Sequence, residues 1–516
     1  MSGSRDPVGD DVILAVDLGT GGPKVGLVGV DGTLHWSGSR AVPTERPGPA
    51  RAVQDAELWW AGLTELVCEG LARSGIPPAS VVAVGVTGQW GSTVPVDADG
   101  RPVGRCRIWQ DHSAARHSRK VVGGPLLGYH PTRLATWLRR TAGVPSPHGG
   151  DPVSHLLGYL RDEPEVAARV RWFLEPVDYL TMRLTGRATA TAASMSGAWL
   201  VDVRGARTAY DRELLLLAGV SGELLPPLLP PQSLVGPLLP EVARLLGLSP
   251  DVLVLSGMPD THSAWVGSGT TGPGELHIAI STSSWISASV SRKRTDVLHS
   301  IATIPGLHRD DYLIADNHES AGASLAWLRD QGFGTTFPEL TEVAAGSPPG
   351  ADGVVFTPWL GGLRSPLDDR AARAGWLNLS HRSTRADLVR AVLEGVAHQA
   401  AWLLPSVLRF TDTPSQALRI LGGGAQSDLW CQIHADVVGR PMERVQDPVT
   451  AQLRGVALAA AVALGQTSWA DVGSLVAPDR TFEPDLARHE AYAAVTAELP
   501  RIHSGLKGTL GRLTGA

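Results

Sequence analysis

The sequence of 516 residues has few cysteines, namely Cys68, Cys106 and Cys431. They are far apart and have no spacing typical of a metal site or a disulfide framework. The simplest interpretation is three buried thiols in a reducing cytosol. Residues 1–11 are polar and of mixed charge, which is not the pattern of a secretory signal peptide.

The sequence also lacks an excess of positive charge and a long apolar run. Its 45 lysines and arginines are outnumbered by 51 aspartates and glutamates, and the formal net charge is −6. Without a basic excess, nucleic acid is not expected as the main partner. The longest membrane-like run, Val456–Leu464, is much too short to span a bilayer. We therefore expect no nucleic-acid partner and no membrane partner.

The length of the chain predicts two domains, because one hydrophobic core does not grow to this size. Helical and strand patterns alternate along much of the sequence, which favours the α/β class. A proline-rich stretch, Leu224–Gln232, is interpreted as the approach to a linker. We place the boundary between Gly247 and Val252, so the predicted domains are residues 1–248 and 249–516.

One arrangement occurs twice, about half the chain apart. An apolar strand, Val12–Val16, ends at Asp17 and is followed by Gly19-Thr20 and a second strand, Val25–Val30. The run Ile278–Ile280 likewise ends at a polar turn and is followed by another strand. This weak internal repetition indicates two similar domains.

The second copy of this arrangement follows an acidic residue, Asp260, which comes soon after the strand that ends at Ser256-Gly257. A carboxylate near the turn Ser281–Ser284, with its hydroxyls and backbone N–H groups, is the minimum needed to move a phosphoryl group onto an alcohol. The alternative is an acidic helix N-cap beside an ordinary hairpin. These residues alone favour the alternative.

Several helices are predicted from the apolar pattern. They are Asp55–Arg73, Arg385–Leu403, a helix from about Ser427 to Val438, and a final helix, Asp447–Gly465. The strand Leu418–Leu421 leads into Gly422–Gly424 at the start of the third of these helices. Glycines at a helix N-terminus let a ligand approach the backbone closely.

Short motifs are spread in order over nearly the whole chain. They are Asp17-Leu18-Gly19-Thr20…Lys24, Gln54-Asp55…Trp59-Trp60, Gly88-Gln89, Trp109-Gln110-Asp111, Asp178-Tyr179-Leu180…Thr185-Gly186, Gly257…Asp260, Thr282-Ser283, Glu394-Gly395 and Gly422-Gly423-Gly424-Ala425-Gln426-Ser427. Each motif alone is weak, but the ordered set resembles the FGGY carbohydrate kinases, and within them the xylulokinases.

The resemblance implies an actin-like ATPase fold, in which two α/β domains on ribonuclease H-like cores surround a central cleft. It implies transfer of the γ-phosphoryl group of ATP to a hydroxyl of a ketose such as D-xylulose. In that family the acid matching Asp260 acts as the base, and the acid matching Asp17 helps to hold Mg²⁺, usually through water. For assembly, the resemblance suggests a homodimer.

The same resemblance implies two sets of binding residues. The ATP-binding residues would be Gly19, Thr20, Lys24, Thr282, Ser283, Gly422, Gly423, Gly424, Ala425 and Gln426. The substrate-binding residues would be Gln89, Trp90, Trp109, Asp111 and Asp260. Structural alternatives are Asp17 as a turn former, Thr282 as a hairpin residue and the glycines as packing at a helix start.

The sequence departs from the family pattern at the predicted site. Gly21-Gly22-Pro23 stands where the family usually has a hydroxyl residue, and Ser281 stands where a glycine is usual. The sugar loop is Gln89-Trp90-Gly91-Ser92 instead of Gln-Met-His-Gly, while Ser113 and Leu363 replace an expected arginine and glutamate. Polar side chains that recognise particular hydroxyls determine which sugar such a kinase accepts, so their loss means that the motifs do not specify the sugar. The alternatives are a kinase for another pentulose or polyol, or a catalytically degenerate protein of the same fold that binds ATP and sugar.

Overall fold

The computed structural model describes residues 11–514, apart from residues 127, 142, 206–207, 297–300 and 309–310. Residues 1–10, most of the polar N-terminal stretch, lie outside this described part. The chain forms two compact units. Unit 1 comprises residues 1–267, 304–312 and 452–475, and unit 2 comprises residues 268–303, 313–451 and 476–516.

The first break between the units differs from the predicted boundary at 248/249. It falls after Gly267, so Asp260 belongs to unit 1, whereas the predicted boundary assigns it to the second domain. The proline-rich stretch is also not the approach to a linker. It contains the strand Leu228–Leu229, which pairs with Ala190–Thr191 inside unit 1.

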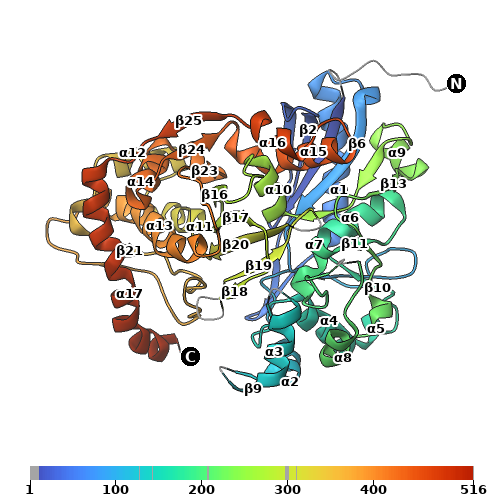
Figure 1. The fold of residues 1–516 in the computed structure, drawn as a ribbon, viewed down its shortest axis with the longest axis horizontal. Helices are drawn as coiled ribbons and strands as arrows, with labels where there is room; N and C mark the ends of the chain where they lie inside the picture. The colour runs from blue at the N-terminus through green and yellow to red at the C-terminus, as the bar shows by residue number, and fades with distance from the viewer. Residues whose placement is uncertain are drawn as a thin grey trace. The chain divides into compact units, whose positions relative to one another are not determined.

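Unit 1 is built on a seven-stranded sheet with the order β13-β14-β6-β1-β2-β3, and β15 also pairs with β6. Strands β2, β6 and β13 of this sheet are labelled in Figure 1. The strands are β1 Val12–Gly19, β2 Gly22–Gly29, β3 Leu34–Ser39, β6 Val81–Gly88, β13 Leu234–Pro237, β14 Leu253–Leu255 and β15 Met258–Pro259. A smaller sheet joins β4 Glu45–Gly48, β5 Arg51–Gln54 and β8 Cys106–Arg107.

Helices cover this sheet because its central strands are apolar on both faces. One face packs on α1 (Ala56–Ser74) through Trp59, Leu63 and Leu66. The other face packs on α15 (Ala451–Ala463), whose many alanines are buried. The predicted helix Asp55–Arg73 is therefore confirmed, with Asp55 as its N-cap. Cys68 of this helix is exposed, so the prediction of a buried thiol is wrong here, whereas Cys106 and Cys431 are buried.

The remaining helices of unit 1 include α2 Ala115–Val122, α3 Pro131–Arg140, α4 Pro152–Asp162, α6 Pro176–Thr185, α7 Ala192–Met195, α8 Arg212–Ala218, α9 Pro240–Leu246, α10 Asp260–Gly267 and α16 Trp469–Leu475. Several of them enclose a second hydrophobic cluster that contains Trp137, Leu156, Phe173 and Leu200. This cluster is separate from the core of the main sheet.

Unit 2 is built on an eight-stranded sheet with the order β18-β19-β20-β17-β16-β23-β24-β25. The strands are β16 Leu276–Ile280, β17 Ser284–Val290, β18 Thr295–Asp296, β19 Ile301–Pro305, β20 Tyr312–His318, β23 Leu418–Leu421, β24 Met442–Val445 and β25 Pro478–Phe482. The helices include α11 Gly322–Asp330, α12 Phe337–Ala345, α13 Arg385–Leu408, α14 Asp428–Val438 and α17 Leu486–Thr514.

The two sheets repeat one strand order, which confirms the internal repetition predicted from sequence. In unit 1, β1 pairs antiparallel with β2 and parallel with β6, and β14 follows in parallel with an antiparallel edge strand, β13. In unit 2, β16 pairs antiparallel with β17 and parallel with β23, and β24 follows in parallel with an antiparallel edge strand, β25. The hairpin turns after β1 and β16 therefore occupy equivalent places.

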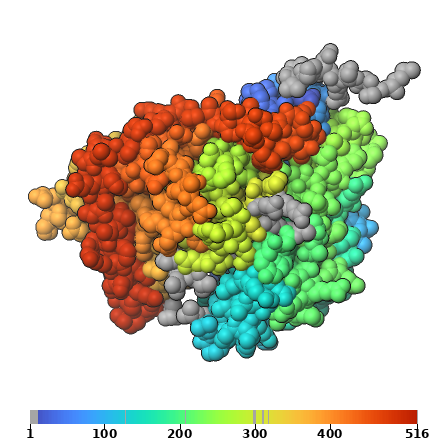
Figure 2. Space-filling model, viewed as in Figure 1, coloured from blue at the N-terminus to red at the C-terminus, as the bar shows by residue number. Residues whose placement is uncertain are grey.

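The C-terminal part of the chain corrects one expectation. The predicted helix Asp447–Gly465 is present as α15, but it is not the final helix. The longest helix, α17, follows and packs on α13 and α14 of unit 2, where it lies at the surface (dark red in Figure 2). In the described part of the chain, no helix is long and apolar enough to cross a membrane.

Candidate active site

Asp17 and Asp260 are brought to the same edge of the unit 1 sheet by strand register. Asp17 of β1 lies beside Thr87 of β6, and Thr87 lies beside Met258 of β15. Asp260 follows two residues after Met258 and begins α10. Because these strands are parallel, their carboxyl ends meet at one edge, which is where open α/β sheets bind ligands.

The first turn of α10 is held to β6 by hydroxyl groups. Ser263 Oγ donates to the Asp260 carbonyl oxygen at 2.9 Å, and Thr87 Oγ1 donates to Ser263 Oγ at 2.9 Å. The Asp260 carboxylate accepts the Thr261 backbone N–H at 2.7 Å. The acid is thus fixed in place by short, local contacts.

The pKa of Asp260 is raised into the range that suits a general base. Burial, and secondarily the negative charge of Asp17, raises the pKa of Asp260 to about 7, against the opposing effect of the Thr261 N–H bond. A pKa near the working pH lets a carboxylate accept a proton and release it again. Two acids at one edge with a raised pKa on one of them are typical of a functional site.

Lys24 lies beside Asp17 because the two residues are direct partners across the β1–β2 hairpin. Lys24 Nζ is 3.4 Å from Asp17 Oδ2, and the Asp17 side chain is buried. Asp17, the predicted metal residue, and Lys24, a predicted ATP-binding residue, are therefore in contact next to the turn at Gly19 and Thr20.

The residues predicted to bind sugar converge on the same turn. Trp109 Nε1 donates to Thr20 Oγ1 at 3.1 Å, and its backbone N–H donates to Ser92 Oγ at 3.1 Å. Gln89 is buried and joins Gln54 and Ser92 through its side-chain amide. The structure therefore brings Thr20, Gln89 and Trp109 together, although they are far apart in the sequence.

Trp90, a predicted substrate-binding residue, is half-buried. Its indole Nε1 donates to the Ser194 carbonyl oxygen at 2.7 Å, and its ring packs closely on Gly197. One edge of the ring is therefore anchored in unit 1, while part of the side chain remains accessible.

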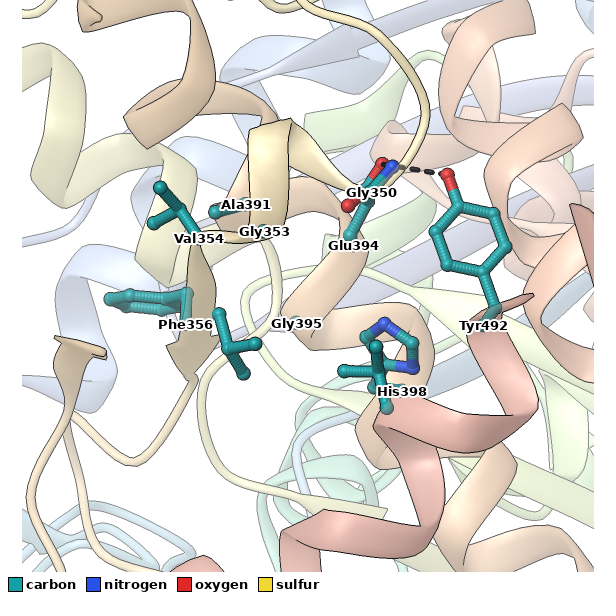
Figure 3. A pocket seen from close by; sticks show the side chains of 11 residues that line it. Gly350, Gly353, Val354, Phe356, Ala391, Glu394, Gly395, His398 and Tyr492 are labelled. Carbon is teal, nitrogen blue, oxygen red and sulfur yellow. Dashed lines mark hydrogen bonds between the residues drawn. The ribbon is translucent and has the colours of Figure 1, made fainter. Parts of the chain in front are cut away.

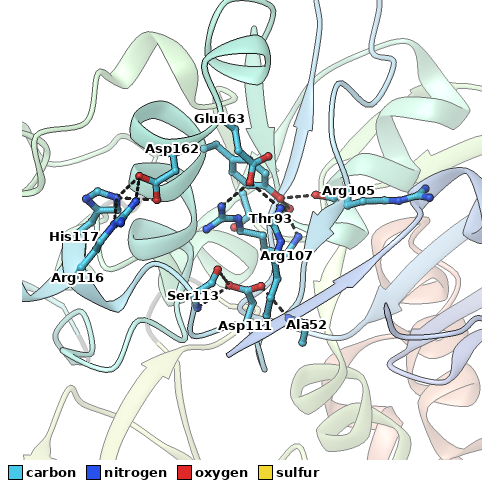
Figure 4. Close-up of polar contacts among 12 residues, drawn as sticks. Ala52, Thr93, Arg105, Arg107, Asp111, Ser113, Arg116, His117, Asp162 and Glu163 are labelled. Atoms are coloured by element: carbon cyan, nitrogen blue, oxygen red, sulfur yellow. Dashed lines mark hydrogen bonds and ion pairs between the residues drawn. The ribbon is translucent and has the colours of Figure 1, made fainter. Parts of the chain in front are cut away.

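Asp111 differs from the other predicted substrate residues because it is fully buried. Its Oδ2 accepts the Ala52 N–H at 2.9 Å, and its Oδ1 accepts both the backbone N–H and the hydroxyl of Ser113, at 3.1 and 2.5 Å (Figure 4). Arg107 and Glu163 form a separate ion pair beside it, at 2.7 Å. In this arrangement Asp111 stabilises its own loop, and Ser113 contributes to that role.

In unit 2, the turn after β16 is joined to the start of α11. The carbonyl oxygen of Thr282 accepts the N–H groups of Ala321 and Ala323, at 3.0 and 2.9 Å, and Ser281 accepts the N–H of Gly322 at 2.8 Å. The residue Thr282 is itself exposed. The backbone of the turn is thus held by hydrogen bonds, and Thr282 is accessible.

The glycine run lies at the same edge of unit 2, because β23 is the parallel neighbour of β16. A Cβ on Gly422 would lie 2.4 Å from the Ile280 carbonyl oxygen, and a Cβ on Gly424 would lie 2.4 Å from the Ile280 side chain. A Cβ on Gly423 would meet no atom within 4 Å. Packing therefore explains two of the glycines but not Gly423, which is exposed together with Gln426.

A small cavity in unit 2 is not a substrate site. Its volume is about 30 Å³, and its lining includes Glu394, His398 and Tyr492 (Figure 3). Tyr492 OH donates to Glu394 Oε1 at 2.6 Å, and Arg390 pairs with the same oxygen at 2.6 Å. Because a cavity of this size holds water and no larger ligand, it belongs to a buried polar network.

The candidate metal residue suits an ion that keeps its water. Among the described residues, no cluster of three or more histidine, cysteine, aspartate or glutamate side chains could hold a metal. Mg²⁺ is commonly bound by one or two carboxylates together with water and substrate phosphates. The single carboxylate of Asp17 therefore fits Mg²⁺ and does not fit a metal that needs a full protein ligand set.

Comparison with known proteins identifies the family. A model of the N-terminal domain of the FGGY family of carbohydrate kinases matches residues 12–267, and a model of the C-terminal domain matches residues 272–464. The chain belongs to the FGGY family of carbohydrate kinases. As an FGGY kinase it is an ATP-dependent sugar kinase.

Relatives of this FGGY kinase include enzymes with two different names. A xylulose kinase from Staphylococcus epidermidis is 27% identical over 93% of this chain and 94% of its own. A glycerol kinase from Gloeobacter violaceus is 30% identical over 91% of this chain and 92% of its own. The similar identities do not separate the two substrates.

A solved xylulose kinase from Lactobacillus acidophilus has the same fold, with a TM-score of 0.85 and 21% identity over 98% of this chain and 100% of its own. The predicted actin-like α/β fold with two ribonuclease H-like cores is therefore confirmed.

Two residues that were not predicted as site residues, Gln54 and Glu175, contact residues of the predicted site or its loop. Gln54 contacts Thr20 and Gln89, and Glu175 accepts the N–H of Ser92 at 3.1 Å. Gln54 stands in a motif of the family resemblance, whereas no motif includes Glu175.

Proposed function

We propose that this FGGY kinase transfers the γ-phosphoryl group of ATP to a hydroxyl of a ketose such as D-xylulose, with Asp260 as the base. The observation behind the proposal is the raised pKa of Asp260, about 7, at the sheet edge shared with Asp17. Asp260 accepts the proton of the sugar hydroxyl while the hydroxyl oxygen attacks the γ-phosphorus. The bond between this phosphorus and the β,γ-bridging oxygen breaks, and ADP leaves with its electrons.

The other proposed roles rest on the resemblance of the surrounding motifs to those of FGGY kinases. In unit 1, Gly19, Thr20 and Lys24 contact phosphate oxygens, and Gln89, Trp90, Trp109 and Asp111 shape the sugar side. In unit 2, Thr282 and Ser283 contact phosphates, and Gly422 to Gln426 line the adenosine side, with Gly423 giving the close approach. Bound Mg²⁺, held by Asp17 through water, would supply positive charge that offsets the phosphate charge.

A second candidate is a kinase for glycerol or another polyol. It is supported by relatives named glycerol kinase at 29–30% identity. Trp90 also supports it, because a tryptophan has one hydrogen-bond donor and this one is already bonded to the Ser194 carbonyl oxygen, so it cannot recognise a sugar hydroxyl.

A catalytically degenerate protein is the third candidate, because Gly21-Gly22-Pro23 offers no hydroxyl. A homodimer and a cytoplasmic location stay predictions.

ADP release with a panel of sugars tests the proposal. Purified protein with ATP and Mg²⁺ is assayed with D-xylulose, other pentuloses, hexuloses, glycerol and other polyols. We expect release that a ketose stimulates most strongly. Stimulation by glycerol alone would favour the second candidate, and ATP binding without stimulation by any compound would favour the third.

A Trp90→Met variant is expected to change which sugars the kinase prefers. Methionine is smaller and lacks the indole donor to Ser194, so the loop Gln89–Ser92 gains space on the sugar side. The ranking of KM values over the panel should change while the KM for ATP moves little.

Thermal unfolding is measured on the same Trp90→Met protein. Because one edge of the ring is anchored, we expect a modest decrease in Tm. A large decrease in Tm with an unchanged KM ranking would assign Trp90 to the core of unit 1.

A further inference from the structure

Five residues of unit 1 form a closed ring of hydrogen bonds, in which Thr20 and Trp109 each use one backbone and one side-chain group. Gln54 Nε2 donates to the Thr20 carbonyl oxygen at 2.7 Å, and Gln89 Nε2 donates to Gln54 Oε1 at 3.0 Å. Ser92 Oγ donates to Gln89 Oε1 at 3.4 Å and accepts the Trp109 N–H at 3.1 Å. Trp109 Nε1 closes the ring at Thr20 Oγ1, at 3.1 Å. The ring joins the phosphate turn to the sugar loop.

Gln54 is the most deeply buried member of the ring. Its relative exposure is 0%, and it ends β5. Thr20, Gln89 and Trp109 are the members with proposed binding roles. Gln54 therefore acts on substrate only through its neighbours, as a positioning residue does.

All four hydrogen-bonding positions of the Gln54 amide are occupied. Besides Thr20 and Gln89, Nε2 donates to Thr44 Oγ1 at 2.9 Å and Oε1 accepts Trp59 Nε1 at 3.2 Å. A carbonyl acceptor on one side and an indole donor on the other allow one orientation of the amide. Because the group is buried and fully satisfied, it fixes the distance between the two segments that it joins.

We propose that Gln54 couples the turn at Thr20 to the loop Gln89–Ser92, so that the phosphate and sugar sides of unit 1 are held in one arrangement. The inference rests on the proposed function for its catalytic consequence. Without the Gln54 amide, the turn at Thr20 and the loop Gln89–Ser92 can move independently. The sugar hydroxyl that receives the phosphoryl group is then misplaced relative to the γ-phosphate of ATP. Small misplacements are costly in a transfer that depends on positioning.

The test compares Gln54→Met with Gln399→Met. Gln399 of α13 is also fully buried, donates to the Ser365 carbonyl oxygen at 2.8 Å and accepts Trp359 Nε1 at 3.0 Å. It lies in unit 2, and no binding role is assigned to it. Both changes remove a buried amide that bonds a carbonyl and an indole, so the Tm should decrease in both variants.

Two measurements separate coupling from a general loss of stability. With D-xylulose and glycerol as acceptors, kcat/KM for the acceptor should fall at least fivefold in Gln54→Met relative to Gln399→Met. In hydrogen–deuterium exchange, the peptides covering residues 18–24 and 89–93 should both exchange faster in Gln54→Met than in wild type. In Gln399→Met, the exchange rates of both peptides should equal those of wild type.

Faster exchange confined to residues near β5 and α1, or equal kcat/KM in the two variants, would overturn the coupling. If Gln54→Met does not fold, Gln54→Glu replaces it, because it keeps the size and the acceptor oxygen but loses the amide donors. If wild type forms no ADP with any acceptor, the proposed function fails, and the exchange measurement still decides whether Gln54 joins the two segments.

Discussion

The Asp260→Asn variant should lose turnover by about a hundred- to ten-thousand-fold, the usual worth of a general base. Asparagine keeps the size of the side chain and can still accept the Thr261 N–H, but it cannot take the proton of the attacking hydroxyl. The loss should appear in kcat, because the KM for ATP depends on other residues. Steady-state kinetics with the best acceptor of the panel measures both quantities.

Asp151→Asn is the matched control for this change. Asp151 is also a buried acid of unit 1, and burial raises its pKa to about 6, but it caps α4 through the Ser154 N–H at 3.1 Å. It should keep near wild-type kcat. Asp260→Asn with more than about a tenth of wild-type kcat would rule out Asp260 as the base.

The same substitution should stabilise the protein at high pH. The folded pKa of Asp260, about 7, is above its ordinary unfolded value, so the acid favours the folded state below about pH 4 and loses that contribution as the pH rises through 7. Three pKa units correspond to about 4 kcal/mol. Without Mg²⁺, the Tm difference between Asp260→Asn and wild type should increase from pH 4 to pH 8. A constant difference would mean that the pKa of Asp260 is not raised.

The sequence predicted the fold because its main elements have local patterns. The apolar run Val12–Val16, the helix Asp55–Arg73 and the glycines before Ser427 each specify an element or a turn without help from distant residues. The repeated strand, turn and strand at Asp17 and Thr282 predicted two similar cores. The ordered motifs then identified the family, although each motif alone is weak.

The parts that were missed depend on contacts between distant residues. The break after Gly267 was not predicted because α10 follows its strand without a linker, and packing alone assigns it to unit 1. α17 was not predicted because much of it is exposed and its apolar pattern is weak. The contacts of Asp111 with Ala52 and Ser113 are visible only in three dimensions. Gln54 and Gln89 are likewise joined only by the fold.

Gly423→Val should raise the KM for ATP by about ten- to a hundredfold, since overpacking typically costs about 1–3 kcal/mol and each 1.4 kcal/mol is tenfold. An added side chain at Gly423 meets no protein atom within 4 Å, so it would occupy space that the proposed nucleotide needs. For the same reason the Tm should not change. ATP-dependent kinetics and thermal unfolding of the variant measure these effects.

Two further glycines distinguish ligand contact from packing. Gly375 of unit 2 also has no atom within 4 Å of an added Cβ, so Gly375→Val should leave both the KM for ATP and the Tm close to wild type. Gly422 has a φ of 90°, and its Cβ would meet the Ile280 carbonyl oxygen, so Gly422→Ala should lower the Tm strongly. If Gly423→Val instead lowers the Tm and leaves the KM for ATP unchanged, the glycine run serves packing at the start of α14, and the adenosine side must lie elsewhere.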